Sequence, residues 1–246
     1  MRFRPLAFIP LLVSALCIVL LVRMSHDDPR YLLAAGAVFV VTMLPAVLAR
    51  RRLRRVLLSG DVHRVLTAWQ PTMERVSHPE TMAPLMIATA YASYGWLEPA
   101  RDALSRAVRG PAWDAAREQR LLIEALLATF EGEREASLDK ARELEGMPLP
   151  SSGLFLRRRV ARLRGGVAAL ARAFAHESSS EDERRLSRAA SASPLMHWAM
   201  RYARAIVAID RGEQEHARSL LAGTPEWPEA SAFASFHAEL MNKLGA

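Results

Sequence analysis

The stretch Thr81–Pro111, TMAPLMIATAYASYGWLEPARDALSRAVRGP, has the residue pattern of two short amphipathic helices that fold back on each other at Gly95. Its small and apolar residues recur at helical spacing on one face of each half. Because glycine adopts backbone angles that other residues avoid, Gly95 marks the point of chain reversal. The stretch therefore predicts a helical hairpin. The residues of its apolar face are Ile87, Ala88 and Tyr91 in the first half and Ala100, Leu104 and Ala107 in the second, and Pro111 closes the unit.

Two later stretches, Leu121–Pro148 and Trp198–Pro225, carry the same pattern more weakly. A small residue on the first helix lets the second helix approach closely, and such hairpins bury their apolar faces only by stacking on one another. Residues 57–246 are therefore predicted to form one all-helical domain of stacked hairpins. In all three stretches an alanine lies seven residues before the turn glycine, as Ala88 before Gly95, Ala125 before Gly132 and Ala205 before Gly212.

The remaining segments of this domain fit the repeat less well. Leu53–Gln70, with a turn at Gly60, is predicted as a leading half-unit whose first helix continues the preceding apolar run. Ser231–Leu244 is predicted as a final helix that covers the end of the stack. For residues 150–194 we expect one degraded unit, either as helices near Leu154–His176 and Ser180–Ser191 or with the first of these divided at Gly165 and Gly166.

The three hairpins together resemble the tetratricopeptide repeat (TPR). The second and third depart from it at Glu124 and Arg204, where the repeat has a large apolar residue, and Ala136 lies one place early. The resemblance implies an α-solenoid that holds a partner on the concave face of its first helices. That face is small and apolar here, so the implied occupant is an apolar or helical partner segment, or the protein's own terminal helix. Carried over by position, the groove residues are Leu85, Thr89, Ala92, Ser93, Leu122, Leu126, Thr129, Tyr202, Ile206 and Ile209.

Two uncharged apolar runs, residues 5–22 and 31–49, precede the helical domain. As helices that rise about 1.5 Å per residue, both are long enough to cross the hydrocarbon core of a bilayer. The segment Arg23–Arg30 between them is short and polar, which favours a tight connection. Residues 1–56 are therefore predicted to form a transmembrane helical hairpin. A cleaved signal peptide is the competing interpretation of the first run, but no small-x-small cleavage site follows it.

The excess positive charge of the chain lies beside these apolar runs. Residues 1–56 carry nine Arg and two Asp, whereas residues 57–246 balance 24 basic against 24 acidic side chains. The positive-inside rule then predicts that both termini and the helical domain are cytoplasmic, at a bacterial inner membrane. We expect membrane lipid as a partner and no nucleic acid, since the folded part has no net charge. The arginines that follow the second run, here called the Arg collar, are Arg50, Arg51, Arg52, Arg54 and Arg55.

No motif predicts catalysis, a metal or a cofactor, and an enzyme is not expected. Glu213 and His216 are three residues apart at a helix start, which is more typical of a solvated turn than of a metal site. Gly165 and Gly166 lack the Lys-Ser/Thr that follows a phosphate-binding glycine loop. The single cysteine, Cys17, excludes a disulfide within the chain.

One basic cluster lies outside the membrane flank, LRRRVARLR at Leu156–Arg164. We interpret it as a solvated helix face whose charge is balanced by EDERR at Glu181–Arg185. The alternative is a surface that binds an acidic peptide or lipid headgroups.

These patterns predict a membrane-anchored scaffold or adaptor whose cytoplasmic TPR-like domain recruits an unidentified protein or peptide. The word scaffold rests on the resemblance alone. The alternative function is an accessory or assembly subunit of a larger membrane complex, with the hairpin packed against other membrane subunits. No oligomeric state is predicted.

Overall fold

The computed structural model describes residues 19, 23, 30–151 and 153–245, and this part of the chain is helical without a strand. The all-α class is therefore confirmed. The chain divides into two compact units, Met1–Arg55 and Val56–Ala246.

The first unit contains most of α2 (Arg30–Leu58), a helix that continues without a break through Pro45. One helix in the described part is long and apolar enough to cross a membrane, and it is this one, over Leu33–Leu58. The five residues of the Arg collar are exposed on it. The first predicted span, residues 5–22, lies outside the described residues except for Val19.

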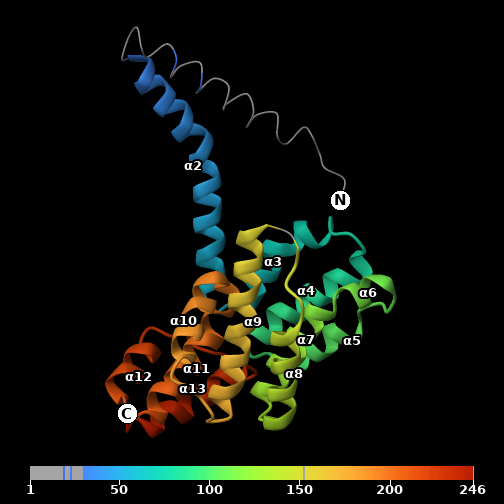
Figure 1. The fold of residues 1–246 in the computed structure, drawn as a ribbon, viewed down its shortest axis with the longest axis vertical. Coiled ribbons are helices and arrows are strands. Elements are labelled where there is room, and N and C mark those ends of the chain that lie inside the picture. The colour runs from blue at the N-terminus through green and yellow to red at the C-terminus, as the bar shows by residue number, and fades with distance from the viewer. Residues whose placement is uncertain (1–18, 20–22, 24–29, 152, 246) are drawn as a thin grey trace. The chain divides into compact units, whose positions relative to one another are not determined.

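The second unit begins with the last turn of α2 and continues through a series of short helices (Figure 1). As predicted, the apolar run of α2 passes directly into the leading helix, which is followed by Gly60 with a φ of 78°. The helices that follow are α3 (Val62–Met73), α4 (Pro79–Ser93), α5 (Leu97–Ser105), α6 (Pro111–Ala115), α7 (Arg117–Phe130), α8 (Arg134–Gly146), α9 (Leu154–Phe174), α10 (Asp182–Ala192), the 3-10 helix η2 (Pro194–Met196), α11 (His197–Asp210), α12 (Gln214–Leu221) and α13 (Ala232–Lys243).

Eight of these helices pack as consecutive pairs, α4 with α5, α7 with α8, α9 with α10 and α11 with α12. The first helices of successive pairs also pack against one another, α4 on α7, α7 on α9 and α9 on α11. The pairs follow each other along the colour gradient of Figure 1 from green to red. The first helices therefore form one continuous layer, and the second helices lie beside their own partners.

The turn inside each pair has the same hydrogen bonds. At the first turn the N–H of Gly95 donates to the carbonyl of Ala92, and the N–H of Trp96 donates to that of Tyr91. Equivalent bonds occur at Gly132 and Gly212, and the three glycines have φ angles of 72°, 79° and 77°. This is the Schellman arrangement, which satisfies the last carbonyls of a helix and favours glycine at the residue of positive φ.

The α9–α10 turn uses the same geometry with a histidine in place of the glycine. His176 has a φ of 55°, its N–H donates to the carbonyl of Ala173, and the N–H of Glu177 donates to that of Arg172. The alanine seven residues before the turn is also present here, because Ala169 precedes His176 by that offset. The degraded unit predicted between residues 150 and 194 is therefore a fourth hairpin. Its alanine and those of the other three, Ala88, Ala125, Ala169 and Ala205, all have no exposed surface.

Helix α9 is not divided at its glycine pair, so the first of the two alternatives for this region is correct. Gly166 lies inside α9, at a point that α10 approaches very closely. A Cβ atom added at Gly166 would lie 2.1 Å from the Cβ of Ala189, whereas real Cβ atoms do not come within 3.0 Å of a neighbour. The glycine therefore permits close packing of two helices rather than a turn.

The substitution Gly166→Ala should destabilise the second unit by about 1–2 kcal/mol, because the added methyl group clashes with Ala189 and its helix-propensity gain offsets only part of that cost. In an Ala189→Gly background the clash is absent, so the same substitution should be neutral or stabilising. Urea unfolding of the full chain in detergent measures both, and tryptophan fluorescence reports the second unit because Trp69, Trp96, Trp113, Trp198 and Trp227 all lie in it. An equal cost in both backgrounds would contradict the close-packing account.

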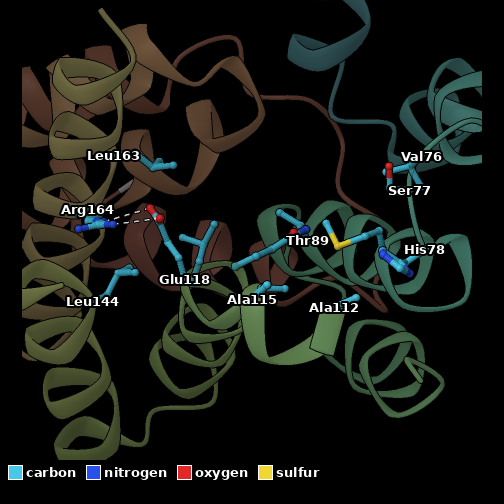
Figure 2. Close-up of a pocket in the computed structure, with 14 residues that line it drawn as sticks. Val76, Ser77, His78, Thr89, Ala112, Ala115, Glu118, Leu144, Leu163 and Arg164 are labelled. Carbon is cyan, nitrogen blue, oxygen red and sulfur yellow. Dashed lines mark hydrogen bonds and ion pairs between the residues drawn. The ribbon is translucent and has the colours of Figure 1, made fainter. Parts of the chain in front are cut away.

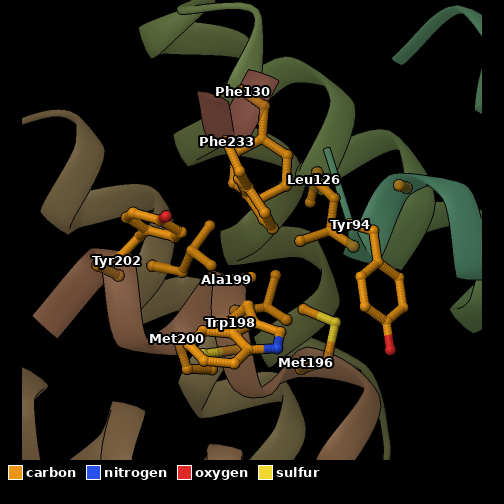
Figure 3. Packing of buried hydrophobic residues seen from close by; sticks show 14 of the residues in the cluster. Tyr94, Leu126, Phe130, Met196, Trp198, Ala199, Met200, Tyr202 and Phe233 are labelled. Carbon is orange, nitrogen blue, oxygen red and sulfur yellow. The ribbon is translucent and has the colours of Figure 1, made fainter. Parts of the chain in front are cut away.

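In the core of the second unit, aromatic side chains join the second and last hairpins (Figure 3). Phe233, at the start of α13, is fully buried, and its ring centroid lies 5.2 Å from that of Phe130 and 5.1 Å from that of Tyr202. The Ser231 hydroxyl donates to the carbonyl of Tyr94 at 2.7 Å. The final helix thus contacts α11, as expected for a helix at the end of the stack, and its first turn also returns to the turn of the first hairpin.

Two aromatic side chains of the hairpins donate hydrogen bonds to the last carbonyls of α2. The Tyr94 hydroxyl donates to the carbonyl of Leu57 at 2.6 Å, and the Trp198 indole N–H donates to that of Leu58 at 3.1 Å. The last carbonyls of a helix have no partner within it, so these bonds satisfy groups that would otherwise be buried and unpaired. Burial raises the pKa of Tyr94 and the charge of Asp61 adds to the effect, so this hydroxyl stays protonated as a donor.

Candidate functional site

The ten predicted groove residues do not form one open surface. Leu122 and Ile209 are half-buried. The rest are buried because each first helix is covered by its partner, by the adjacent first helices and by the residues around α13. The buried eight are Leu85, Thr89, Ala92, Ser93, Leu126, Thr129, Tyr202 and Ile206.

A pocket of about 590 Å³ opens where α4, α6, α7, α8 and α9 meet (Figure 2). Thr89 and Leu122, two of the predicted groove residues, line it. The loop before α4 forms one end, at Val76, Ser77 and His78, and α7 and α9 form the other. Its walls are mainly apolar, with the side chains of Met82, Ala112, Ala115, Ala116, Leu122, Leu144 and Leu163.

The charged groups of the pocket neutralise one another at the α9 end. The Arg164 guanidinium meets the Glu118 carboxylate in a two-pronged ion pair, with Nε–Oε1 at 3.0 Å and Nη2–Oε2 at 2.9 Å. The Nη1 group also donates to the carbonyl of Met147 at 2.5 Å and to that of Pro148 at 3.3 Å. Arg164 thereby ties the α8–α9 connection to α7.

The interpretation of the LRRRVARLR cluster as one solvated helix face is wrong for Arg164, which is buried. Its side chain is only 4% exposed, whereas Arg157, Arg158, Arg159 and Arg162 are exposed. The EDERR segment also pairs elsewhere: Asp182 binds Arg172, and Glu183 binds Arg204 and Arg211. The sequence places arginines on a helix, but the neighbouring carbonyls of Met147 and Pro148 decide which one is buried.

The floor of the pocket is also satisfied internally. The Thr89 hydroxyl donates to the carbonyl of Leu85 at 2.7 Å and accepts from the Gln119 side-chain amide at 3.1 Å. A ligand in this pocket therefore meets aliphatic side chains and polar groups whose main bonds are already made. Such a lining favours an apolar ligand, because most of the surface that it would contact is aliphatic and the Arg164–Glu118 pair is already neutralised.

The protein's own terminal helix contributes no residue to this pocket, whose lining lies entirely between Val76 and Arg164. Of the two occupants that the resemblance implies, α13 lies elsewhere on the predicted groove, because Phe233 and His237 contact Tyr202. Sequence reasoning missed the loop Val76–His78, α6 and α9 as pocket walls. The prediction considered only the first helix of each recognised repeat, and α9 belongs to the hairpin whose turn residue is His176.

Glu183, Glu213 and His216 place three potential metal ligands within 4.8 Å of one another in the described part of the chain. Glu183 is already bound by His216 at 2.9 Å and by Arg204 and Arg211, each at 3.3 Å. The hydrogen bond from His216 lowers the pKa of Glu183, burial opposes it, and Arg204 lowers the pKa further. Two guanidinium groups at this carboxylate oppose a second cation, so the geometry favours an ion-pair cluster that joins α10, α11 and α12.

No protein-family model, no curated protein and no solved structure matches the chain.

Proposed function

We propose that the chain is a membrane-anchored adaptor that binds an apolar segment of a partner protein in the pocket formed by α4, α6, α7, α8 and α9. The pocket carries this proposal, because it is large, mainly apolar and located on the layer of first helices. A side-chain lining of this kind accommodates the apolar face of a helix or an extended segment. The partner would therefore present two or three consecutive aliphatic anchors with little charge.

The TPR-like solenoid belongs to this proposal. Four consecutive helix pairs, the contiguous layer of first helices and the repeated turn geometry support it. In such an architecture each pair lacks a core of its own and stacking supplies one, which leaves an extended surface for binding. The proposed groove is narrower than the resemblance implies, because only Thr89 and Leu122 of the ten predicted positions line the pocket.

Membrane anchoring is the second part of the proposal. The length and composition of α2 support it, together with the uncharged run at residues 5–22 and the Arg collar. We propose that both apolar runs cross the membrane as a hairpin and that the helical domain is cytoplasmic, since the arginines flank the outer ends of the two runs.

In-cell photocrosslinking tests the adaptor proposal. A photoreactive amino acid at Met82, which lines the pocket, should give a discrete adduct with one partner protein, and the same probe at Glu135, exposed on α8, should not. Ala115 is an exposed pocket residue, so Ala115→Arg should place a charge in the apolar opening without disturbing the fold, and should reduce the adduct at least fivefold.

The matched control is Ala238→Arg, which adds the same charge at an exposed alanine on α13 and should leave the adduct unchanged. The crosslinked peptide of the partner should map to an apolar segment. The proposal fails if the Met82 and Glu135 probes give the same adducts, or if Ala115→Arg has no more effect than Ala238→Arg.

A further inference from the structure

Exposed apolar side chains of the second unit are concentrated at the start of α9. Of the five large apolar residues with high exposure in its described part, four lie between residues 149 and 156, and Val108 is the fifth. Phe155 is 90% exposed, the highest value among them. Scattered exposed apolar residues are ordinary, but a contiguous group marks an interaction surface. The four are Leu149, Leu154, Phe155 and Leu156.

Positive charge adjoins this apolar group directly. Arg157, Arg158 and Arg162 are exposed on the next two turns of α9. The first turn of α9 has no acidic residue, and residues 147–153 before it carry no charge. The nearest acids along the chain, on α8, are engaged elsewhere, Glu143 with Arg117 at 2.5 Å and Glu145 with Arg185 at 3.2 Å.

We propose that this surface, here called the α9 patch (Leu149, Leu154, Phe155, Leu156, Arg157, Arg158 and Arg162), binds the surface of an anionic membrane. Exposed aliphatic and aromatic side chains enter the boundary between headgroups and acyl chains, and adjacent arginines pair with lipid phosphates. Both requirements meet in the one element. An acidic protein surface would satisfy the arginines but would leave Phe155 exposed.

The proposal rests on the membrane anchoring proposed above, because the anchor keeps the α9 patch close to the membrane surface that it would bind. A domain tethered to a bilayer meets that surface at a high effective concentration, so even a weak patch becomes occupied. Arg159 is left out of the patch because its guanidinium donates to the carbonyl of Ala192 at 3.1 Å, a bond that joins α9 to the end of α10.

Fluorescence in reconstituted vesicles tests the proposal. The full chain, with Cys17→Ser, would carry one environment-sensitive fluorophore at Leu154→Cys or, as the control, at Glu135→Cys. Arg134 pairs with Glu177, so the start of α8 lies by the end of α9, about 30 Å along the helix from the patch. In vesicles with 30% phosphatidylglycerol and 70% phosphatidylcholine, a lipid-borne quencher should quench the label at position 154 at least threefold more than the label at position 135.

Two double variants with the same change in charge, one in the α9 patch and one outside it, distinguish binding by the patch from a general effect of net charge. Arg157→Glu with Arg158→Glu should reduce the quenching at position 154 to the level at position 135. Arg106→Glu with Arg142→Glu changes two exposed arginines on α5–α6 and α8 and should leave it unchanged. Vesicles of phosphatidylcholine alone should show less than half of the quenching seen with the anionic lipid.

Equal quenching at the two label positions, equal quenching with and without anionic lipid, or the same response to both double variants would overturn the α9 patch. Flotation of the vesicles after an alkaline wash measures anchoring through the apolar runs separately. If the chain floats with the vesicles after the wash but the label at position 154 is not quenched, the membrane anchor is supported and the α9 patch is contradicted. If the wash removes the chain from the vesicles, the membrane anchor is contradicted, whatever the label reports.

Discussion

Replacing Asp182 with alanine should lower the free energy of unfolding of the second unit by about 3–5 kcal/mol, because it leaves a partly buried arginine without its counter-charge. The Asp182 side chain has no exposed surface. Its Oδ2 accepts from Arg172 Nε at 2.9 Å and from the N–H of Ser179 at 2.8 Å, and its Oδ1 accepts from Arg172 Nη2 at 2.6 Å. Urea unfolding followed by tryptophan fluorescence measures the loss.

Two controls distinguish charge burial from side-chain loss. Arg142 and Asp139 form an exposed pair, with 72% and 70% of their side chains exposed, so Asp139→Ala should cost less than about 1 kcal/mol. The double variant Arg172→Met with Asp182→Leu removes both charges and should recover more than half of the loss of Asp182→Ala. A double variant as unstable as the single one would show that the hydrogen bond to the Ser179 turn, and not the ion pair, is decisive.

The same carboxylate makes stability depend on pH at the acid end. Burial alone would raise the pKa of Asp182, but the hydrogen bonds from Arg172 and from the Ser179 backbone outweigh it and hold the pKa below its usual value. Since the folded-state pKa lies below the unfolded one, the stabilisation is complete above the unfolded pKa of about 3.9 and is lost as pH falls through the folded pKa. The stability difference between the natural chain and Asp182→Ala should therefore be constant near neutral pH and narrow below about pH 4.

Local features of the sequence account for the helical class and for three of the four turns. Gly95, Gly132 and Gly212 are predictable because a residue of positive φ at a helix end is most often glycine. The fourth turn cannot be predicted from a glycine, because His176 adopts the same positive φ there. A hydrogen bond between its Nδ1 and Asp210 Oδ1 at 2.9 Å supports this conformation. The alanine seven residues earlier, Ala169, indicates this turn, but a pattern that requires glycine at the turn does not match His176.

Positions that depend on distant contacts were not predictable from local pattern. Gly166 resembles a helix breaker until Ala189 is placed against it. Five residues after its turn glycine the second hairpin has the buried Ser137, where the first has Ala100, and Ala136 is only half-buried. The repeat therefore keeps its spacing and changes its residue type. The sequence of a helix shows which face is apolar, but not whether that face lines a groove or packs in the core. The predicted groove therefore includes Leu85 and Leu126, which the structure shows to be buried.

Replacing Phe233 with alanine should destabilise the second unit by about 3–5 kcal/mol, the range for a fully buried aromatic side chain. The ring of Phe233 fills the space among three others, with centroid distances of 5.2 Å to Phe130, 5.1 Å to Tyr202 and 5.0 Å to Trp227. The N–H of Ala232 donates to the carbonyl of Gly95 at 2.8 Å, so loss of the ring should also loosen the turn of the first hairpin. Hydrogen exchange should accelerate in α13 and around Gly95, while α8, which contributes no side chain to this aromatic cluster, keeps its protection.

Phe155→Ala is the matched control, because it removes the same side chain from a position that is 90% exposed and should change stability by less than about 0.5 kcal/mol. The two variants differ in burial and not in chemistry, so their difference isolates what Phe233 contributes through packing. If Phe233→Ala costs no more than Phe155→Ala, the return of the C-terminal helix to the first hairpin does not hold the unit together. If it costs the expected amount but exchange accelerates only within α13, the core and the Gly95 turn are energetically separate. The contact of Phe233 with Tyr202 and the hydrogen bond of the adjacent Ala232 to Gly95 predict instead that the first and last hairpins unfold together.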